Sequence, residues 1–150
     1  MEGIPCLPGT YVLILQVEEA QWVQVGRLGE FRIPAGWLAY AGSARGPGGL
    51  SARLARHLRY PKPARWHIDF LQPAAQPTAI WWAAGADRRE CFWAAALARM
   101  PGASCPIPGF GSSDCRCPAH LVHFPELPDR ERFIRLTGEE GVAEALIRAR

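Results

Sequence analysis

The segment Gly9-Thr10-Tyr11-Val12-Leu13-Ile14-Leu15-Gln16-Val17 has the run of β-branched, aromatic and aliphatic residues that is typical of a strand. Trp22–Gly26 follows after a turn and alternates apolar and polar residues, which predicts a second strand. Trp37–Gly42 predicts a third strand, after a loop at Ile33–Gly36. Because the connections between the three segments are short, they favour a small antiparallel sheet.

Helical periodicity begins after the glycine-rich stretch Gly46–Gly49. Leu50–Tyr60 predicts a helix, because leucines recur along it every four residues and form a buried stripe, and prolines follow it. We then expect a short helical or irregular piece at Trp66–Leu71, a buried strand at Thr78–Ala84 and a helix at Arg88–Met100. A long loop at Pro101–Pro118 and a strand at His120–Phe124 follow, and two short helices, at Asp129–Leu136 and Glu139–Ala149, end the chain. This order predicts a single α/β or α+β domain over residues 1–150, in which a three-stranded antiparallel central sheet is flanked by helices, with an extra C-terminal strand and helices.

The composition is that of one globular domain. The chain has 150 residues, of which 49% are hydrophobic and 21% are charged. It has no apolar run of membrane-spanning length, and Met1–Pro5 lacks the features of a signal peptide. We therefore expect a cytoplasmic protein without a membrane partner; nothing in the sequence indicates its oligomeric state.

Positive charge is concentrated in one segment. Residues 43–67 carry six basic residues and no acidic one, although the formal net charge of the whole chain is only +3. Such a patch attracts a polyanion, but a solvated arginine-rich helix has the same composition. The cations expected to contact nucleic acid are Arg45, Arg56, Arg59, Lys62 and Arg65.

The chain has five cysteines, an odd number, and no secretory signal, which argues against a disulfide framework. Cys115, Cys117 and His120 lie close together in sequence, and with Cys91 they could form a tetrahedral zinc site that holds the long loop to the helix that carries Glu90. Reduced, buried cysteines and a disulfide are the alternatives.

Gly9-Thr10-Tyr11 and Tyr40-Ala41-Gly42 resemble the two tripeptides that name the GIY-YIG nuclease superfamily. The resemblance implies that both tyrosines lie on adjacent strands of a three-stranded antiparallel sheet. It implies that the following helix carries a catalytic arginine and histidine, here Arg53 and His57. It also implies that Glu90, on a later helix, holds the catalytic metal, Mg²⁺ or Mn²⁺.

More narrowly, the chain resembles an uncharacterised branch of this superfamily, whose members occur alone or joined to helix-hairpin-helix DNA-repair glycosylases. Such a glycosylase is therefore an expected partner. The matching segments cover roughly the first four-fifths of the chain and are Tyr40–Ala44, Gly48–Leu50, Trp66–Asp69, Glu90–Cys91 and Phe110–Leu121. Thr10 and Ala41 replace the isoleucines of the family name. The family usually has an asparagine near the end of the domain; this chain has none, and Asp114, Ser113 and His120 are the candidates to replace it.

Physical chemistry gives each candidate a second interpretation. Arg53 and His57 are four residues apart and share a helix face, where a guanidinium suits the charge that develops on a phosphate; Arg53 is otherwise a surface ion pair. His57 is a general base, a phosphate ligand or a structural histidine. Tyr11 and Tyr40 are otherwise core aromatics, and Glu90 is otherwise a solvated helix residue. Tyrosine is a poor base near neutral pH unless a cation lowers its pKa.

His67 and Asp69 are secondary catalytic candidates, together with Asp114. The first two residues could form a histidine–carboxylate couple near the site, or they could cap a helix. Together these features predict a metal-dependent endonuclease that hydrolyses DNA phosphodiester bonds, in repair or on branched or damaged DNA, with RNA left open as a substrate. The alternatives are a non-catalytic nucleic-acid-binding module and a zinc-stabilised partner domain of a repair enzyme.

Overall fold

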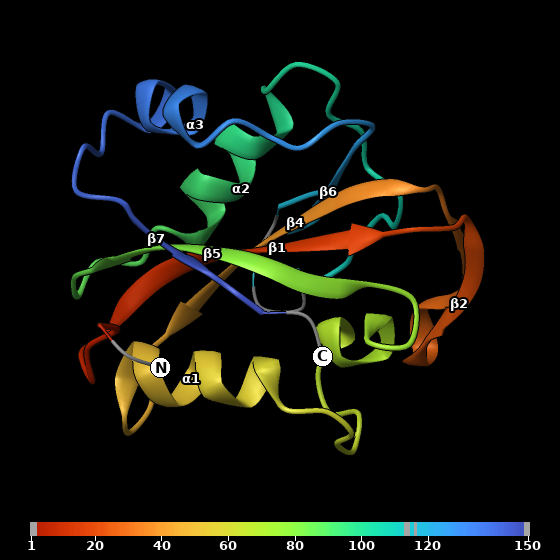
Figure 1. Cartoon of the computed structure of the whole chain (residues 1–150), viewed down its shortest axis with the longest axis horizontal. Coiled ribbons are helices and arrows are strands. Elements are labelled where there is room, and N and C mark those ends of the chain that lie inside the picture. Colours follow the sequence, from red (N-terminus) through yellow and green to blue (C-terminus); the bar gives the residue numbers. More distant parts are fainter. Residues whose placement is uncertain (1–2, 113–114, 116, 149–150) are drawn as a thin grey trace.

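A computed structural model describes residues 3–112, 115 and 117–148. These residues form an α+β fold with a five-stranded antiparallel sheet, a separate two-stranded hairpin and three α-helices (Figure 1). The sheet has the strand order β6-β4-β1-β5-β7, with the bounds Leu121–Phe124, Gly36–Ala44, Gly9–Val17, Gln76–Ala84 and Ala143–Leu146.

Strand β1 lies at the centre of the sheet, between β4 and β5. In the β1–β4 pairing, Tyr11 is opposite Gly42 and Leu13 is opposite Tyr40. Since directly opposed residues point to the same face of a sheet, both tyrosines lie on one face. The predicted placement of the two tyrosines on adjacent strands is therefore confirmed.

The two faces of the sheet are covered by different helices (Figure 1). Helix α1 (Gly49–Leu58) lies on the face of the tyrosines, and its buried Leu50 and Leu54 belong to the core on that side. Helices α2 (Glu90–Ala98) and α3 (Arg130–Thr137) lie on the other face, where Trp93 packs edge-on against Phe133 with ring centroids 5.1 Å apart. No helix in the described residues is long and apolar enough to cross a membrane.

The predicted membership of the central sheet is partly wrong. Strand β2 (Gln21–Val25) pairs with β3 (Gly29–Ile33) in a separate hairpin, and β5 takes the place beside β1. The second strand of this hairpin, β3, was not predicted, because polar residues interrupt its apolar ones, and it begins at Gly29 and ends just before Pro34. The sheet has five strands rather than three, because β6 and β7 extend its two edges.

The predicted helix at Glu139–Ala149 is also wrong. Its alanine, leucine and glutamate residues favour a helix intrinsically, but Ala143–Leu146 forms the edge strand β7. The strand pairs with β5, and Trp81 Nε1 donates a 3.0 Å hydrogen bond to Glu144 Oε2. Pairing with an exposed sheet edge thus overrides the local helix propensity.

Candidate active site

A cavity of about 410 Å³ lies where the tyrosine face of the sheet meets α1, the start of α2 and the loop before β6. Its lining combines aromatic, cationic and acidic side chains with backbone from β4 and the loop. The residues are Tyr11, Tyr40, Gly42, Ser43, Arg45, Arg53, Arg65, Trp66, His67, Arg88, Glu90, Gly111, Cys115 and His120. Four of the five predicted catalytic residues therefore line the same cavity.

The fifth predicted catalytic residue, His57, does not line the cavity but contacts the Tyr11 side chain. The Tyr11 hydroxyl lies 2.6 Å from His57 Nε2, and both residues are buried. Opposite Tyr11, Gly42 leaves the space that the ring needs, because a Cβ at position 42 would lie only 2.5 Å from the Tyr11 hydroxyl oxygen and 2.6 Å from Cζ. A glycine in the second tripeptide thus accommodates the tyrosine of the first.

The ionisation of this pair is dominated by burial. Burial, followed by the nearby Tyr40, raises the pKa of Tyr11 far above its ordinary value. Burial, followed by the charges of Lys62 and Arg53, lowers the pKa of His57 to about 3. At neutral pH both side chains are therefore uncharged. His57 Nδ1 has no hydrogen-bond partner among the described residues.

Tyr40 is half-buried, and its ring contacts His57 and Phe110 edge-on, with centroids 6.1 and 5.9 Å away. Burial raises the pKa of Tyr40 to about 12, although the positive charge of Arg53 opposes this shift. Tyr40 is thus a neutral hydroxyl group on the cavity wall.

Arg53 is positioned by contacts with a backbone carbonyl and an aromatic ring. Its Nη1 donates a 3.0 Å hydrogen bond to Ser43 O in β4. Its guanidinium carbon lies 4.5 Å from the centroid of the Trp66 ring, and that of Arg56 lies 3.9 Å from the same centroid. Both distances are within the range of favourable cation–π interactions. Trp66 therefore holds both arginines beside the cavity, a role that the sequence did not predict.

The expected couple of His67 and Asp69 is not formed, and the helix-cap alternative for Asp69 is correct. Asp69 accepts hydrogen bonds from the backbone N–H groups of Arg65 and Trp66, at 2.8 and 2.9 Å, ahead of a short 3₁₀ helix at His67–Leu71. It also accepts two hydrogen bonds from Arg56, at 3.1 and 2.9 Å. Asp69 is thus a buried structural carboxylate outside the cavity lining.

Two of the predicted nucleic-acid contacts have structural partners. Lys62 Nζ donates to the carbonyl oxygens of Arg56 and His57 at the end of α1, lies 3.7 Å from Asp69, and has a side chain only 3% exposed. Lys62 is therefore unsuited to a surface contact with nucleic acid, and Arg56 is held by its pairing with Asp69. Arg59 is exposed but does not line the cavity.

His67 lies on the cavity wall, where its Nδ1 accepts a 2.9 Å hydrogen bond from the backbone N–H of Gly111. Burial lowers the pKa of His67. Since Nδ1 acts as an acceptor, the neutral ring carries its proton on Nε2, which is then a donor.

Glu90 is the first residue of α2 and lines the cavity. Its Oε2 is buried and has no hydrogen-bond partner among the described residues. A buried carboxylate oxygen without a donor is costly, and a hard divalent cation would provide the missing partner. The residue thus fits the role of a metal ligand. Asp114 and Ser113, proposed above as replacements for the family asparagine, lie outside the described residues.

The cations of the cavity come from two separate segments. Arg45 and Arg65 were predicted from the basic segment, and Arg45 donates a 2.6 Å hydrogen bond to Ala86 O. Arg88, which precedes α2, also lines the cavity and was not predicted, because the charge count singled out residues 43–67 alone.

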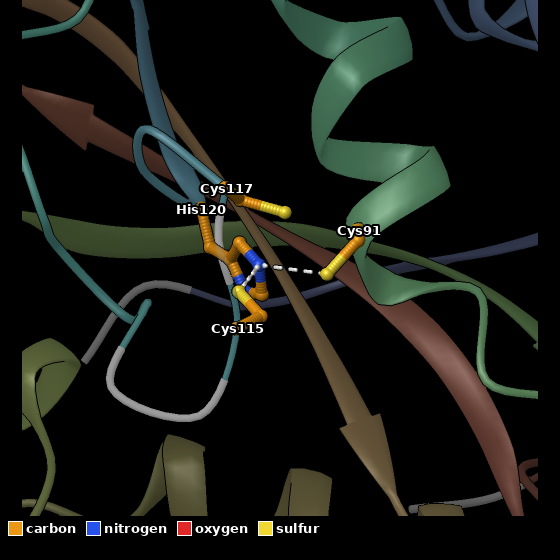
Figure 2. A group of neighbouring side chains, drawn as sticks. All are labelled: Cys91, Cys115, Cys117 and His120. Atoms are coloured by element: carbon orange, nitrogen blue, oxygen red, sulfur yellow. Dashed lines mark hydrogen bonds between the residues drawn. The ribbon is translucent and has the colours of Figure 1, made fainter.

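A second cluster adjoins this cavity. Cys91, Cys115, Cys117 and His120 place their potential ligand atoms within 4.8 Å of one another (Figure 2). Both Cys115 and His120 also line the cavity. The arrangement is consistent with the structural zinc site predicted from the sequence, and the structure contains no disulfide between these residues.

The comparison with known families matches residues 10–141, a range that includes both the cavity and the cysteine cluster. The chain belongs to the family described as Domain of unknown function DUF123. No curated protein and no solved structure matches it.

Proposed function

We propose that this DUF123 domain is a metal-dependent endonuclease that hydrolyses phosphodiester bonds in DNA. The observation that carries the proposal is the convergence of Tyr11, Tyr40, Arg53 and Glu90 on one cavity, from two strands and two helices. The proposal agrees with the resemblance to GIY-YIG nucleases, which implies a catalytic role for each of these four residues.

Binding of a phosphodiester is supported by the charge of the cavity. Arg45, Arg53, Arg65 and Arg88 line it, against a single acidic residue in the described lining, Glu90. Guanidinium groups bind phosphate oxygens through paired hydrogen bonds. Because Arg53 is already held by Ser43 O and Trp66, little reorganisation is needed when charge develops on the phosphate.

Glu90 would hold the divalent cation, Mg²⁺ or Mn²⁺, which supplies charge stabilisation and a more acidic water when it is bound. The remaining steps belong to the side chains of the chain itself. Tyr11 and Tyr40 are neutral hydroxyls, so in the unliganded cavity they orient water rather than act as ready bases. His57 acts as a positioning residue, because it contacts the Tyr11 hydroxyl and does not line the cavity. The Nε2–H group of His67 is a donor for a phosphate oxygen.

The test is a cleavage assay with supercoiled, single-stranded and branched DNA, in Mg²⁺, Mn²⁺ or EDTA. We expect metal-dependent nicking that Arg53→Ala and Glu90→Gln reduce by at least about 100-fold, while DNA binding by fluorescence anisotropy persists. Arg132→Ala and Glu126→Gln are the matched controls, because both residues are exposed and outside the cavity. Equal nicking by wild type and Glu90→Gln would contradict the proposal.

A second candidate function is a nucleic-acid-binding module without activity. It is favoured by the raised pKa values of Tyr11 and Tyr40 and the lowered pKa of His57, which leave these three groups without basic character near neutral pH. Salt-dependent DNA binding without cleavage of any of the three substrates would select this alternative.

A further inference from the structure

We propose that Cys91, Cys115, Cys117 and His120 bind one Zn²⁺ ion that fastens the loop before β6 to the first turn of α2. This site is separate from the metal position at Glu90, and the proposal holds whether or not the domain cleaves DNA.

The two printed sulfur–nitrogen distances in the cluster are close to those of tetrahedral zinc coordination. With Zn–S bonds of about 2.3 Å and a Zn–N bond of about 2.0–2.1 Å, a sulfur–nitrogen edge is about 3.6 Å and a sulfur–sulfur edge about 3.8 Å. Cys91 Sγ and Cys115 Sγ lie 3.6 and 3.3 Å from His120 Nε2. All four potential ligand atoms lie within 4.8 Å of one another, so shifts of about 1 Å or less would complete the geometry.

The donor set selects the metal. Three cysteines and one histidine are a common structural zinc set, and the four side chains point toward a common centre (Figure 2). Four ligands from the protein leave no open position, so this site suits a structural rather than a catalytic ion. The remaining cysteines, Cys6 and Cys105, are exposed and lie outside the cluster.

The elements that supply the ligands explain what the ion would do. Cys91 is the second residue of α2, and His120 immediately precedes β6, while Cys115 and Cys117 come from the loop. The loop is tied to itself by Gly109 N–H to Pro118 O and His120 N–H to Phe110 O, both at 2.7 Å. The zinc would add a strong link between this loop and α2. It would fix the helix turn that carries Glu90 without touching Glu90 itself.

The test measures metal in the purified full-length chain. We expect about one equivalent of zinc by mass spectrometry after gel filtration, and after exchange with Co²⁺ the intense visible absorption of tetrahedral thiolate coordination. Cys117→Ser and His120→Ala should lose this zinc, whereas Cys105→Ser, a change at an exposed cysteine of the same loop, should retain it.

Thiol reactivity of the wild-type chain keeps the proposal testable if a ligand variant fails to fold. Of the five cysteines, two should react rapidly with a thiol reagent in the native protein, and all five after a chelator removes the zinc. Rapid reaction of all five without a chelator, a disulfide between two cluster cysteines, or a different metal at the same four residues would overturn the proposal. If the wild-type protein contains zinc but cleaves none of the DNA substrates, the proposed function is contradicted and the zinc proposal is not.

Discussion

Replacing Asp69 by alanine should destabilise the domain strongly. The carboxylate, with a side chain 1% exposed, accepts two hydrogen bonds from Arg56 and one each from the backbone N–H groups of Arg65 and Trp66. It is also the anionic neighbour of Lys62, 3.7 Å away. The substitution would leave the buried Lys62 without its counter-ion and would remove a cap from the 3₁₀ helix.

The magnitude follows from two independent arguments. Removing one partner of a buried ion pair costs about 3–5 kcal/mol, because the other charge stays buried and uncompensated. Burial alone would raise the pKa of Asp69, but hydrogen bonds from Arg56, Trp66 and Arg65 outweigh it and lower the pKa from 3.8 to about 2. At about 1.4 kcal/mol per pKa unit, the ionised form contributes about 2 kcal/mol at neutral pH. We therefore expect about 2 kcal/mol for Asp69→Asn and about 3–5 kcal/mol for Asp69→Ala.

The assay is urea unfolding at pH 7, followed by circular dichroism and by tryptophan fluorescence. Asp87→Ala is the matched control, because Asp87 is exposed, and it should change the unfolding free energy by less than about 0.5 kcal/mol. A loss below about 1 kcal/mol for Asp69→Ala would refute the assignment of Asp69 as a buried counter-ion. It would also reopen Arg56 and Lys62 as surface contacts for nucleic acid.

Two further predictions concern Tyr11 and its neighbours. The pKa of His57 is lowered to about 3 in the native state, whereas in the unfolded chain this histidine is protonated below about pH 6.5. The unfolding free energy should therefore fall as the pH drops from 6.5 toward 3, by up to about 1.4 kcal/mol per pH unit. Urea unfolding at pH 7, 5.5 and 4.5 checks this, and an unchanged unfolding free energy would contradict it. Gly42→Ala should cost about 1–3 kcal/mol in the same assay, since the added methyl overlaps the Tyr11 ring. Gly141→Ala, where a Cβ meets nothing within 4 Å, should stay within about 0.5 kcal/mol of wild type, and equal effects of the two substitutions would show that Tyr11 is not packed as described.

Local patterns predicted most elements of this fold, but not all of their partners. The strands at Gly9–Val17 and Gln76–Ala84 are recognisable from their composition, yet nothing local indicates that they are neighbours in the sheet. The error at Ala143–Leu146 has the same origin, because the segment's own propensity is helical and only the free edge of β5 makes it a strand.

The sequence pointed to cavity residues that belong to a motif, but not to residues whose roles depend on contacts between separate elements. Arg53 and Glu90 follow from their motifs, and both line the cavity. Trp66 and Arg88 were missed, because their roles depend on which side chains the fold brings beside them. Conversely, Lys62 was counted as a surface cation because a charge count cannot distinguish a solvated amine from one bonded to two carbonyl oxygens at a helix end.

The register of β1 and β4 gives the two tripeptides a joint physical meaning. Because Tyr11 is directly opposite Gly42, the tyrosine of the first tripeptide and the glycine of the second form one cross-strand pair. The missing side chain at Gly42 leaves room for the Tyr11 ring, and the hydroxyl then meets His57 Nε2 from α1 at 2.6 Å. The middle residues of the two tripeptides, Thr10 and Ala41, take part in neither contact. A single methyl group at position 42, by contrast, would overlap the Tyr11 side chain and should disturb both contacts.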